Sequence, residues 1–403
     1  MDSELFRKGC RGARKSKSLS LIFLVLFWSA CHKGQKSESN VRVEFIDGVE
    51  CIHNTGTPLH PDKTVTFVED LSISGEDKDG NIILFKPRLL FVDDNENIYI
   101  SESKDQVIKV FGSDGKYIKK IGAQGSGPGE FKSVSSLVVT KDRQLLVMDQ
   151  TSRRTSFFDS SGRFLKSFQW RTGYFNFIMI KSSSYIISEI VYSGDRRFDQ
   201  LFVKEVDFNG KEIRFSGEFT PPEPKIFRQG KYSHFIIPPV MISSIFAGDQ
   251  DRGLFYHCLN NKYIIEVYDT SGKLFRKIDR PYEPVPFTDK DAKEYRARYG
   301  YGNLPNDFLS KAIEEMEMPK LKSIVERMYV DDEGNLWIRT NEIKEEEDKV
   351  LTAFDIFDSD GYYFAKVWTA IIPFIFKKGK IYRMDTDQDT GYESLKRYKV
   401  IWE

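Results

Sequence analysis

The stretch IYISESKDQVIKVFGSDGKYIKKIG, residues Ile98–Gly122, decides the fold. Apolar and polar residues alternate in both of its arms, and a Ser-Asp-Gly turn separates the arms. This pattern predicts two antiparallel strands joined by a tight turn. Similar segments recur along the chain, with turn glycines at Gly115, Gly162, Gly210, Gly272 and Gly361. Their separations of 47, 48, 62 and 89 residues indicate a repeated unit near 47 residues, lengthened by insertions in the third and fourth intervals.

A second set of polar turns joins an earlier pair of strands within each unit. These turns lie in Asp93–Ile100, Thr140–Val147, Asp249–Tyr256, Asp331–Ile338 and Phe376–Arg383. Four antiparallel strands in a unit of this length are typical of a propeller blade. Six inner strands are expected near Arg88–Asp93, Ser135–Thr140, Phe175–Lys181, Ser243–Gly248, Val325–Val330 and Pro373–Lys377. The predicted fold class is therefore all-β, a six-bladed β-propeller over residues 62–403.

The two ends of this region complement each other. The sixth unit ends in a third strand, Leu395–Glu403, without a fourth, whereas Thr64–Ile73 has strand character and no partner in its own unit. An unpaired sheet edge invites association with other chains. We therefore expect the N-terminal strand to complete blade six and close the ring.

One short motif adds a family resemblance. GSGPGEF (Gly125–Phe131), followed by a hydrophobic strand, LLVMD and a GRFL hairpin, is similar to the NHL repeat. Residues 62–403 as a whole resemble the six-bladed propeller lipoproteins of bacteria. This resemblance implies a propeller on the cell envelope, but only one copy of the motif is intact, so it implies no ligand.

The first thirty residues differ from the rest in composition. Six basic residues precede an apolar run, Leu19–Ala30, which is too short to span a bilayer and predicts a signal peptide over residues 1–30. WSAC, Trp28–Cys31, resembles the bacterial lipobox, although the family prefers Leu where Trp28 stands. We expect lipidation of Cys31 and an exported, lipid-anchored protein whose only membrane contact is this anchor; plain secretion is the alternative.

Residues 31–61 are expected to form a tether and an N-terminal extension. His32–Asn40 is polar, whereas Val41–Ile52 has strand character and should pack on a blade. The remaining cysteines, Cys51 and Cys258, are expected to be buried hydrophobes, with a disulfide as the alternative. The spacing of His and Cys residues supports no zinc site.

Composition excludes other classes. The chain has 60 basic and 60 acidic residues, 40% hydrophobic residues and 14% aromatic residues. It can bury a large core, so disorder is excluded, and its zero formal charge gives no reason to expect nucleic acid as a partner. A monomer is expected.

Long insertions should mark the working face. Thr220–Pro239 joins blades three and four, and Arg280–Ser323 joins blades four and five, on the face where the second strands end. Caps and spacing predict two short helices, Asp289–Tyr299 and Pro305–Met318, as a lid insertion over about residues 285–320. The alternative is a decoration that packs against two blades.

The ends of the second strands supply the candidate site. The repeat alignment places Glu102, Asp149, Glu189, Cys258, Thr340 and Asp385 at one equivalent position. The carboxylates Glu102, Asp149, Glu189 and Asp385 would suit calcium, whereas the alternative is that they cap the adjoining turns. Candidate ligand-binding side chains beside them are Arg153, Arg154, Arg196, His257 and Arg339, and charge pairing is the alternative role for the arginines.

Catalytic motifs are missing. The sequence has no nucleophile elbow between a strand and a helix, no HExxH and no P-loop. We therefore expect a non-catalytic recognition module without a cofactor, which binds a peptide, protein or glycan on its loop-rich face. The alternative is a calcium-dependent hydrolase or lyase similar to the propeller lactonases.

Overall fold

The computed structural model describes the chain from residue 41 onward, except residues 76–83, 171–174, 193–197, 223, 230–231, 301–311, 348, 374 and 387–390. The predicted signal peptide, the lipobox at Cys31 and the polar tether lie outside the described residues. None of the described helices is long and apolar enough to cross a membrane.

Each repeat of the sequence forms one antiparallel sheet. Blades one to three contain β4 (Pro87–Val92), β5 (Ile98–Glu102), β6 (Val107–Phe111) and β7 (Tyr117–Ile121); β10 (Val134–Val139), β11 (Leu145–Asp149), β12 (Arg154–Phe158) and β13 (Phe164–Gln169); β14 (Phe175–Ile180), β15 (Ser184–Tyr192), β16 (Phe198–Asp207) and β17 (Glu212–Phe219). Blades four to six contain β20 (Ser244–Asp249), β21 (Leu254–Leu259), β22 (Ile264–Asp269) and β23 (Leu274–Asp279); β24 (Val325–Val330), β25 (Leu336–Glu346), β26 (Lys349–Phe357) and β27 (Tyr363–Thr369); β28 (Ile375–Lys377), β29 (Lys380–Thr386), β30 (Glu393–Trp402) and β3 (Val65–Ile73).

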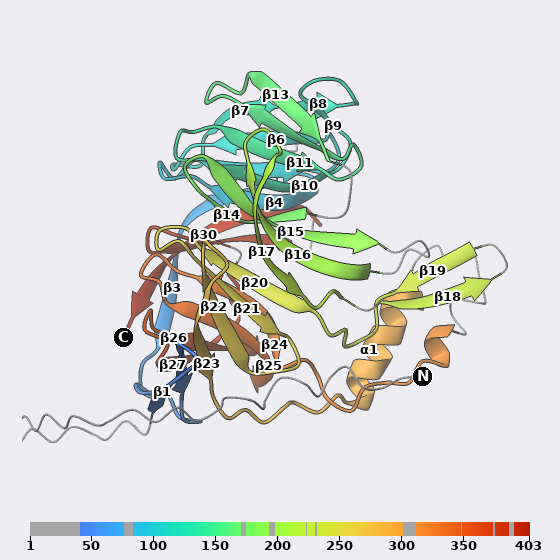
Figure 1. Ribbon diagram of the computed structural model, residues 1–403. Helices are drawn as coiled ribbons and strands as arrows, with labels where there is room; N and C mark the ends of the chain where they lie inside the picture. Colours follow the sequence, from blue (N-terminus) through green and yellow to red (C-terminus); the bar gives the residue numbers. More distant parts are fainter. Residues whose placement is uncertain are drawn as a thin grey trace, which may run out of the picture. The chain divides into compact units, whose positions relative to one another are not determined.

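The innermost strands close into a ring. Strands β4, β10, β14, β20, β24 and β28 contact one another in this order, and β28 contacts β4 again. Figure 1 shows the sheets arranged around this centre. The fold is a six-bladed β-propeller, which confirms the fold class predicted from the repeats.

The N-terminal strand closes the ring as predicted. β3 lies antiparallel to β30, with Val65 opposite Trp402 and Ile73 opposite Leu395. The side chain of Arg397 joins this closure to blade one, because it donates to Asp70 of β3 and to the carbonyl oxygen of Ser113. The edge that blade six would otherwise expose is therefore covered.

The extension before β3 follows the rim of three blades. β1 (Arg42–Ile46) and β2 (Val49–His53) form a hairpin, and β2 pairs parallel with β23 of blade four, which confirms that this segment packs on a blade. Beyond β2, Leu59 and His60 donate backbone hydrogen bonds to the outer strand of blade five. Residues 49–73, which we call the belt, therefore contact the outer strands of blades four and five in turn and then form the outer strand of blade six.

A buried charged cluster lies between blades four and five. The carboxylate of Asp355, which is fully buried, accepts hydrogen bonds from the hydroxyls of Tyr263 and Tyr363 and from the guanidinium of Arg280. The Arg280 guanidinium also faces the rings of Tyr263 and Tyr363, each 4.7 Å away. Every oxygen of the buried carboxylate is thereby satisfied, as a buried charge requires.

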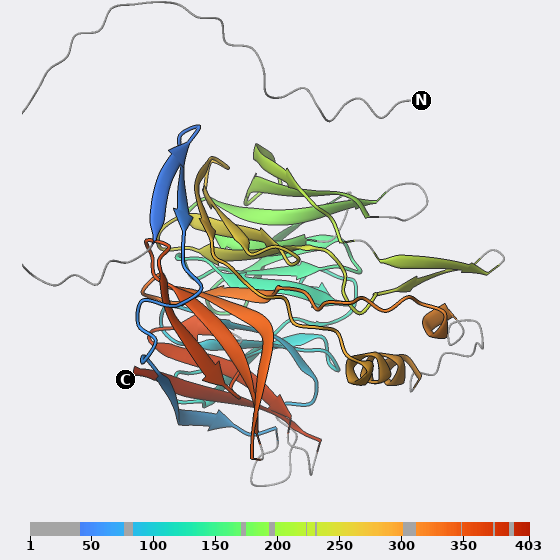
Figure 2. The same ribbon diagram turned by 90° about the horizontal axis from the view of Figure 1, so that it is seen from below.

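The two long insertions meet on one side of the molecule. Residues Thr220–Pro239, expected as a loop, contain the hairpin β18 (Lys225–Gln229) and β19 (Tyr232–Ile236), and the predicted first helix is present as α1 (Asp289–Gly300). Both views show α1 and this hairpin on the side toward which β15 points (Figures 1 and 2). The hydroxyl of Tyr295 in α1 donates to the carbonyl oxygen of Ile237. Of the predicted second helix, residues 312–314 are helical, and residues 305–311 lie outside the described residues.

Candidate ligand-binding groove

Two of the four predicted carboxylates bind the backbone of an adjoining loop. Glu102 accepts from the amides of Phe85 and Lys86 at 2.9 and 2.7 Å, and Lys109 lies 3.3 Å away. Asp149 accepts from three backbone amides and from the Ser152 hydroxyl. Both side chains are buried, so their oxygens already have partners in the propeller itself.

The other two carboxylates form ion pairs within their own blades. Glu189 lies 2.7 Å from the ammonium of Lys204, and Asp385 contacts the guanidinium of Arg383. Among the described residues, no three His, Cys, Asp or Glu side chains gather closely enough to hold a metal ion. The structure therefore does not bring the four carboxylates of the predicted calcium site together.

The described arginines of the predicted site likewise do not share one partner. Arg154 donates to the carbonyl oxygens of Ser126 and Glu130, which fixes the GSGPGEF loop against blade two. Arg339 lies 2.9 Å from the carboxylate of Glu326 on the neighbouring strand. Arg153 is exposed, with a backbone φ of 49° at the end of its loop. Arg196 lies outside the described residues.

The predicted alignment is wrong by one residue in blade four. Glu102 and Asp149 are the last residues of the second strands of their blades and pair with Pro87 and Val134 of the inner strands. In blade four the residue at this place is Leu259, which pairs with Ser244 of β20. The cause is the length of the second strand: β21 has six residues, whereas β5 and β11 have five each, so the strand end lies one residue later in blade four. Cys258 consequently packs in the core between blades four and five as a free buried thiol, and Cys51 is likewise free.

His257 lies in a hydrogen-bonded chain. Its Nδ1 is 3.0 Å from Glu266 and its Nε2 is 2.9 Å from the hydroxyl of Ser244. This order resembles a hydrolase triad, but the Ser244 hydroxyl donates to the carbonyl oxygen of Thr220, and Phe219 covers the imidazole at 4.6 Å. Since Phe219 and Thr220 belong to the end of blade three, the chain of bonds connects blades three and four.

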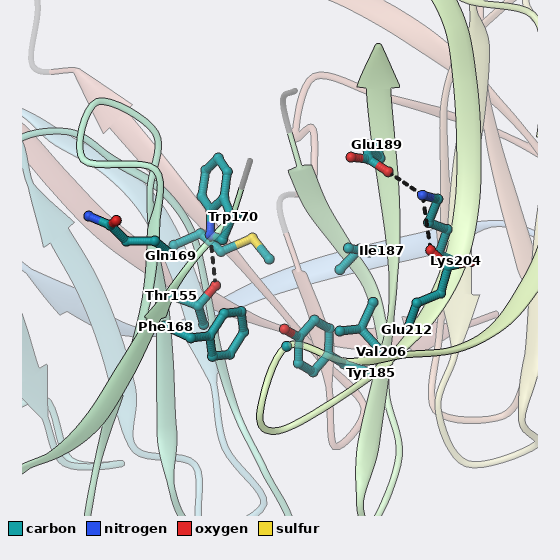
Figure 3. A pocket seen from close by; sticks show the side chains of 12 residues that line it. Thr155, Phe168, Gln169, Trp170, Tyr185, Ile187, Glu189, Lys204, Val206 and Glu212 are labelled. Atoms are coloured by element: carbon teal, nitrogen blue, oxygen red, sulfur yellow. Dashed lines mark hydrogen bonds and ion pairs between the residues drawn. The ribbon is translucent and has the colours of Figure 1, made fainter. Parts of the chain in front are cut away.

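A groove between blades two and three has a different character. It measures about 270 Å³, and Phe168, Gln169 and Trp170 of blade two face Tyr185 and Ile187 of blade three across it. Figure 3 shows the aromatic side chains on its two sides. Such a volume suits one ring-sized group of a larger ligand.

Charged groups occupy the blade-three side of the groove. The ammonium of Lys204 lies between Glu189, at 2.7 Å, and Glu212, at 3.1 Å, as Figure 3 also shows. Burial lowers the pKa of Lys204, but the bonds from the two carboxylates outweigh burial and raise this pKa above its ordinary value. On the opposite wall, the indole Nε1 of Trp170 donates to the hydroxyl of Thr155 at 3.1 Å, which fixes the ring. The groove thus combines fixed aromatic faces with a negatively biased polar wall.

Sequence reasoning found only Glu189 among the residues of this groove. The missed side chains are Phe168, Trp170, Tyr185, Lys204 and Glu212. One signal was present: FQW at Phe168–Trp170 places two aromatic residues at alternate positions of one strand face. The residues on the other wall of the groove belong to the next repeat. Sequence analysis of single repeats therefore does not predict that the two walls face each other.

A second cavity lies between the two insertions. It measures about 700 Å³ and is lined by residues 238–242, Ala312 and residues 315–320, together with Lys225. Met316 and Met318 pack beside Ile236 in the small apolar core of this region. The two insertions therefore contact each other.

Comparison with known families agrees with the fold. Residues 76–224 match a family model, DUF5128, described as a 6-bladed beta-propeller. No curated protein matches the chain.

Solved structures extend this agreement to most of the chain. A member of the DUF4221 family from Bacteroides vulgatus is 11% identical, covers 84% of this chain and 98% of its own, and has a TM-score of 0.52. A Bacteroides fragilis protein inferred to be exported is 13% identical, with coverages of 88% and 99% and a TM-score of 0.47. A virginiamycin B lyase from Staphylococcus aureus is 11% identical, with coverages of 84% and 100% and a TM-score of 0.36. At these identities, the likeness to the Bacteroides vulgatus protein supports the fold alone.

Proposed function

We propose that the protein is a non-catalytic recognition module of the bacterial cell envelope, anchored by lipid at Cys31, and that it binds a glycan in the groove between blades two and three. The fold supports presentation of such a site on a rigid scaffold. The NHL-like motif contributes to this scaffold, because Arg154 holds its loop in place.

The groove itself carries the proposal. Sugar rings have apolar C–H faces, which stack on aromatic rings, and hydroxyl edges, which bond to carboxylates and ammonium groups. Trp170 and Phe168 supply the first kind of contact, and Glu189, Lys204 and Glu212 supply the second. A peptide with an aromatic or aliphatic side chain uses the same faces, so peptides are the second class to test.

Substitution of the indole tests the site. We expect Trp170→Ala to weaken binding to a glycan array at least 10-fold, because stacking is lost, while thermal unfolding changes little. Trp368→Ala is the matched control, since Trp368 is a partly buried tryptophan in the outer strand of blade five. If the wild type binds a peptide array and not the glycan array, the ligand is a peptide. Equal binding by both variants would refute the groove as the site.

The anchor is tested separately. Replacing Cys31 by Ser should release the protein from the membrane fraction without changing its unfolding temperature, because the first described strand begins at Arg42. Mass spectrometry of the mature N-terminus gives the direct measurement. An unmodified N-terminus at another residue would show that Trp28 breaks the lipobox and that the protein is secreted without lipid.

The calcium-dependent hydrolase or lyase is the alternative. It would require Glu102, Asp149, Glu189 and Asp385 to share one ion, yet each has its own partners in the structure. Metal analysis of the purified protein decides between the two functions: stoichiometric calcium that Asp149→Asn removes would favour the enzyme.

A further inference from the structure

Among the described residues, strand β1 is the free edge of the largest sheet. The sheet of blade four has the order β1-β2-β23-β22-β21-β20, and no other described strand lies beyond β1. Figure 2 shows the β1–β2 hairpin projecting from the remainder of the blades. A free edge with apolar side chains is a template for another strand, and natural proteins usually blunt it with inward charges, bulges or proline. β1 contains no proline, and its pairing with β2 is regular.

The apolar side chains of this edge are exposed on one face. Val43 is 40% exposed and Phe45 is 73% exposed, and both point to the same face because strand residues alternate. Across the sheet, Val43 is paired with Ile52 and Ile52 with Ile278, which are both buried. The apolar row of blade four therefore continues to the sheet edge and ends in solvent.

The hairpin turn fixes which backbone groups point outward. The two-residue loop Asp47–Gly48 has φ values of 51° and 81°, as in a type I′ turn. Such a loop closes on a hydrogen-bonded pair, here Ile46 with Val49, and hydrogen-bonded pairs then alternate with non-bonded pairs. The N–H and C=O groups of Val43 and Phe45 consequently point away from β2 and toward the free edge.

We propose that β1 pairs antiparallel with β1 of a second copy of this chain, with Val43 on the twofold axis. In this register Val43 lies opposite the partner's Val43 and Phe45 opposite the partner's Val41, as hydrogen-bonded pairs. Arg42 then lies opposite the partner's Glu44, and Glu44 opposite the partner's Arg42, so the two strands form two cross-strand ion pairs. The sequence VRVEF, Val41–Phe45, is thus complementary to itself.

The charges of Arg42 and Glu44 favour this register and a second copy of the chain as the partner. Pairing centred on Glu44 also satisfies the outward backbone groups, but it places Glu44 opposite the partner's Glu44, which is unfavourable. Within one chain Arg42 lies 3.5 Å from Glu44, with 68% and 38% of the two side chains exposed. Because this local pair is solvent-exposed, exchanging it for the partner's charge loses little. The pairing replaces the expected monomer by a twofold dimer in which two blades form one continuous sheet.

A disulfide test reports the register. In the proposed dimer the two Val43 Cα atoms lie about 5.5 Å apart, which is within disulfide range. The full chain carrying Val43→Cys, oxidised in isolated membranes, should yield a covalent homodimer on a non-reducing gel. Ile46→Cys is the matched control: it is 50% exposed on the same hairpin, but its Cα lies about 20 Å from its counterpart, so it should stay monomeric.

A charge-swap series tests the partner by sedimentation of the full chain in detergent. Arg42→Glu and Glu44→Arg should each lower the association constant about 10-fold or more. Their equimolar mixture should associate as heterodimers, and the double variant should associate like the wild type, because each restores opposite charges. Equal crosslinking at positions 43 and 46, or a mixture no more associated than its components, would overturn the pairing. A crosslink from position 43 to another protein only would likewise overturn it in favour of a foreign strand.

Discussion

Glu266 belongs to the hydrogen-bonded chain that connects blades three and four, so its ionisation affects how these two blades pack. The hydrogen bond with His257, aided by the Tyr268 hydroxyl and the Lys277 ammonium, outweighs burial and lowers the pKa of Glu266 from 4.5 to about 2. A carboxyl group with a lowered pKa stabilises the folded state above its unfolded pKa of 4.5. This stabilisation is lost progressively as the pH falls from about 4.5 to about 2.

Replacement of Glu266 should therefore change the acid stability of the protein. We expect Glu266→Gln to lower the free energy of unfolding at pH 7 by about 1–2 kcal/mol, a value reduced from the full pKa shift because solvent screens a side chain that is 24% exposed. Below about pH 2 the variant and the wild type should converge. Urea unfolding from pH 2 to 7 measures this, with the exposed Glu218→Gln as the control; parallel curves for Glu266→Gln and the wild type would contradict the assignment.

At this scale, sequence reasoning identified strand positions better than side-chain partners. It placed Glu102 and Asp149 correctly at the ends of second strands, where they bind loop amides. It misplaced Cys258 by one position, because the second strand of blade four is one residue longer than the second strands of blades one and two. Nor did it bring His257 to Glu266, which lies on the adjacent strand of the same blade.

The belt depends on one buried amide where it crosses from blade four to blade five. Asn54 is 5% exposed; its side chain donates to the carbonyl oxygen of Gly361 and accepts from the amide of Tyr363. Gly361 has a φ of 90°, and a Cβ on it would lie 3.0 Å from Ile52. The turn of blade five therefore packs closely against the belt, and glycine at position 361 allows this close approach.

Removal of this amide should loosen the belt. We expect Asn54→Ala to lower the free energy of unfolding by about 2 kcal/mol, because two buried backbone groups lose their partners. Thr55→Ala removes a neighbouring exposed hydrogen bond and should change stability by less than about 0.5 kcal/mol. Chemical denaturation measures both, and hydrogen exchange of β2 should increase in the first variant only. Equal stabilities would show that solvent replaces the Asn54 contacts.

Elements were predicted from the sequence to different degrees. The hairpins of the blades follow from period-two alternation and from turn glycines, and α1 follows from its Thr288–Asp291 cap. The β18–β19 hairpin was missed, since its strands lie inside an insertion that has no counterpart in other repeats. The path of the belt was predicted only in part, because parallel pairing of β2 with β23 leaves no local signature.

For the whole molecule, the turn glycines predicted the repeat length, six expected inner strands predicted six blades, and the unpaired strands at the two ends predicted the closure. Closure can be tested by comparing two shortened chains. A chain that begins at Thr64 loses β1 and β2 but keeps β3, and it should unfold cooperatively at a reduced temperature. A chain that begins at Gly75 also loses β3, which exposes β30 and leaves Arg397 without Asp70. We expect it to lack a cooperative transition in calorimetry; unfolding of both chains at the same temperature would contradict closure.

The pairing of Val65 with Trp402 also sets the order in which the protein folds. The chain is made from its N-terminus, so β3 emerges early and has no partner until the last residues have followed. Contacts between such distant positions form slowly, and the unpaired edges of β3 and β30 are open to aggregation until they meet. The five blades between them can form locally beforehand. Completion of the ring is therefore the final and slowest step, and refolding yield should fall with rising protein concentration.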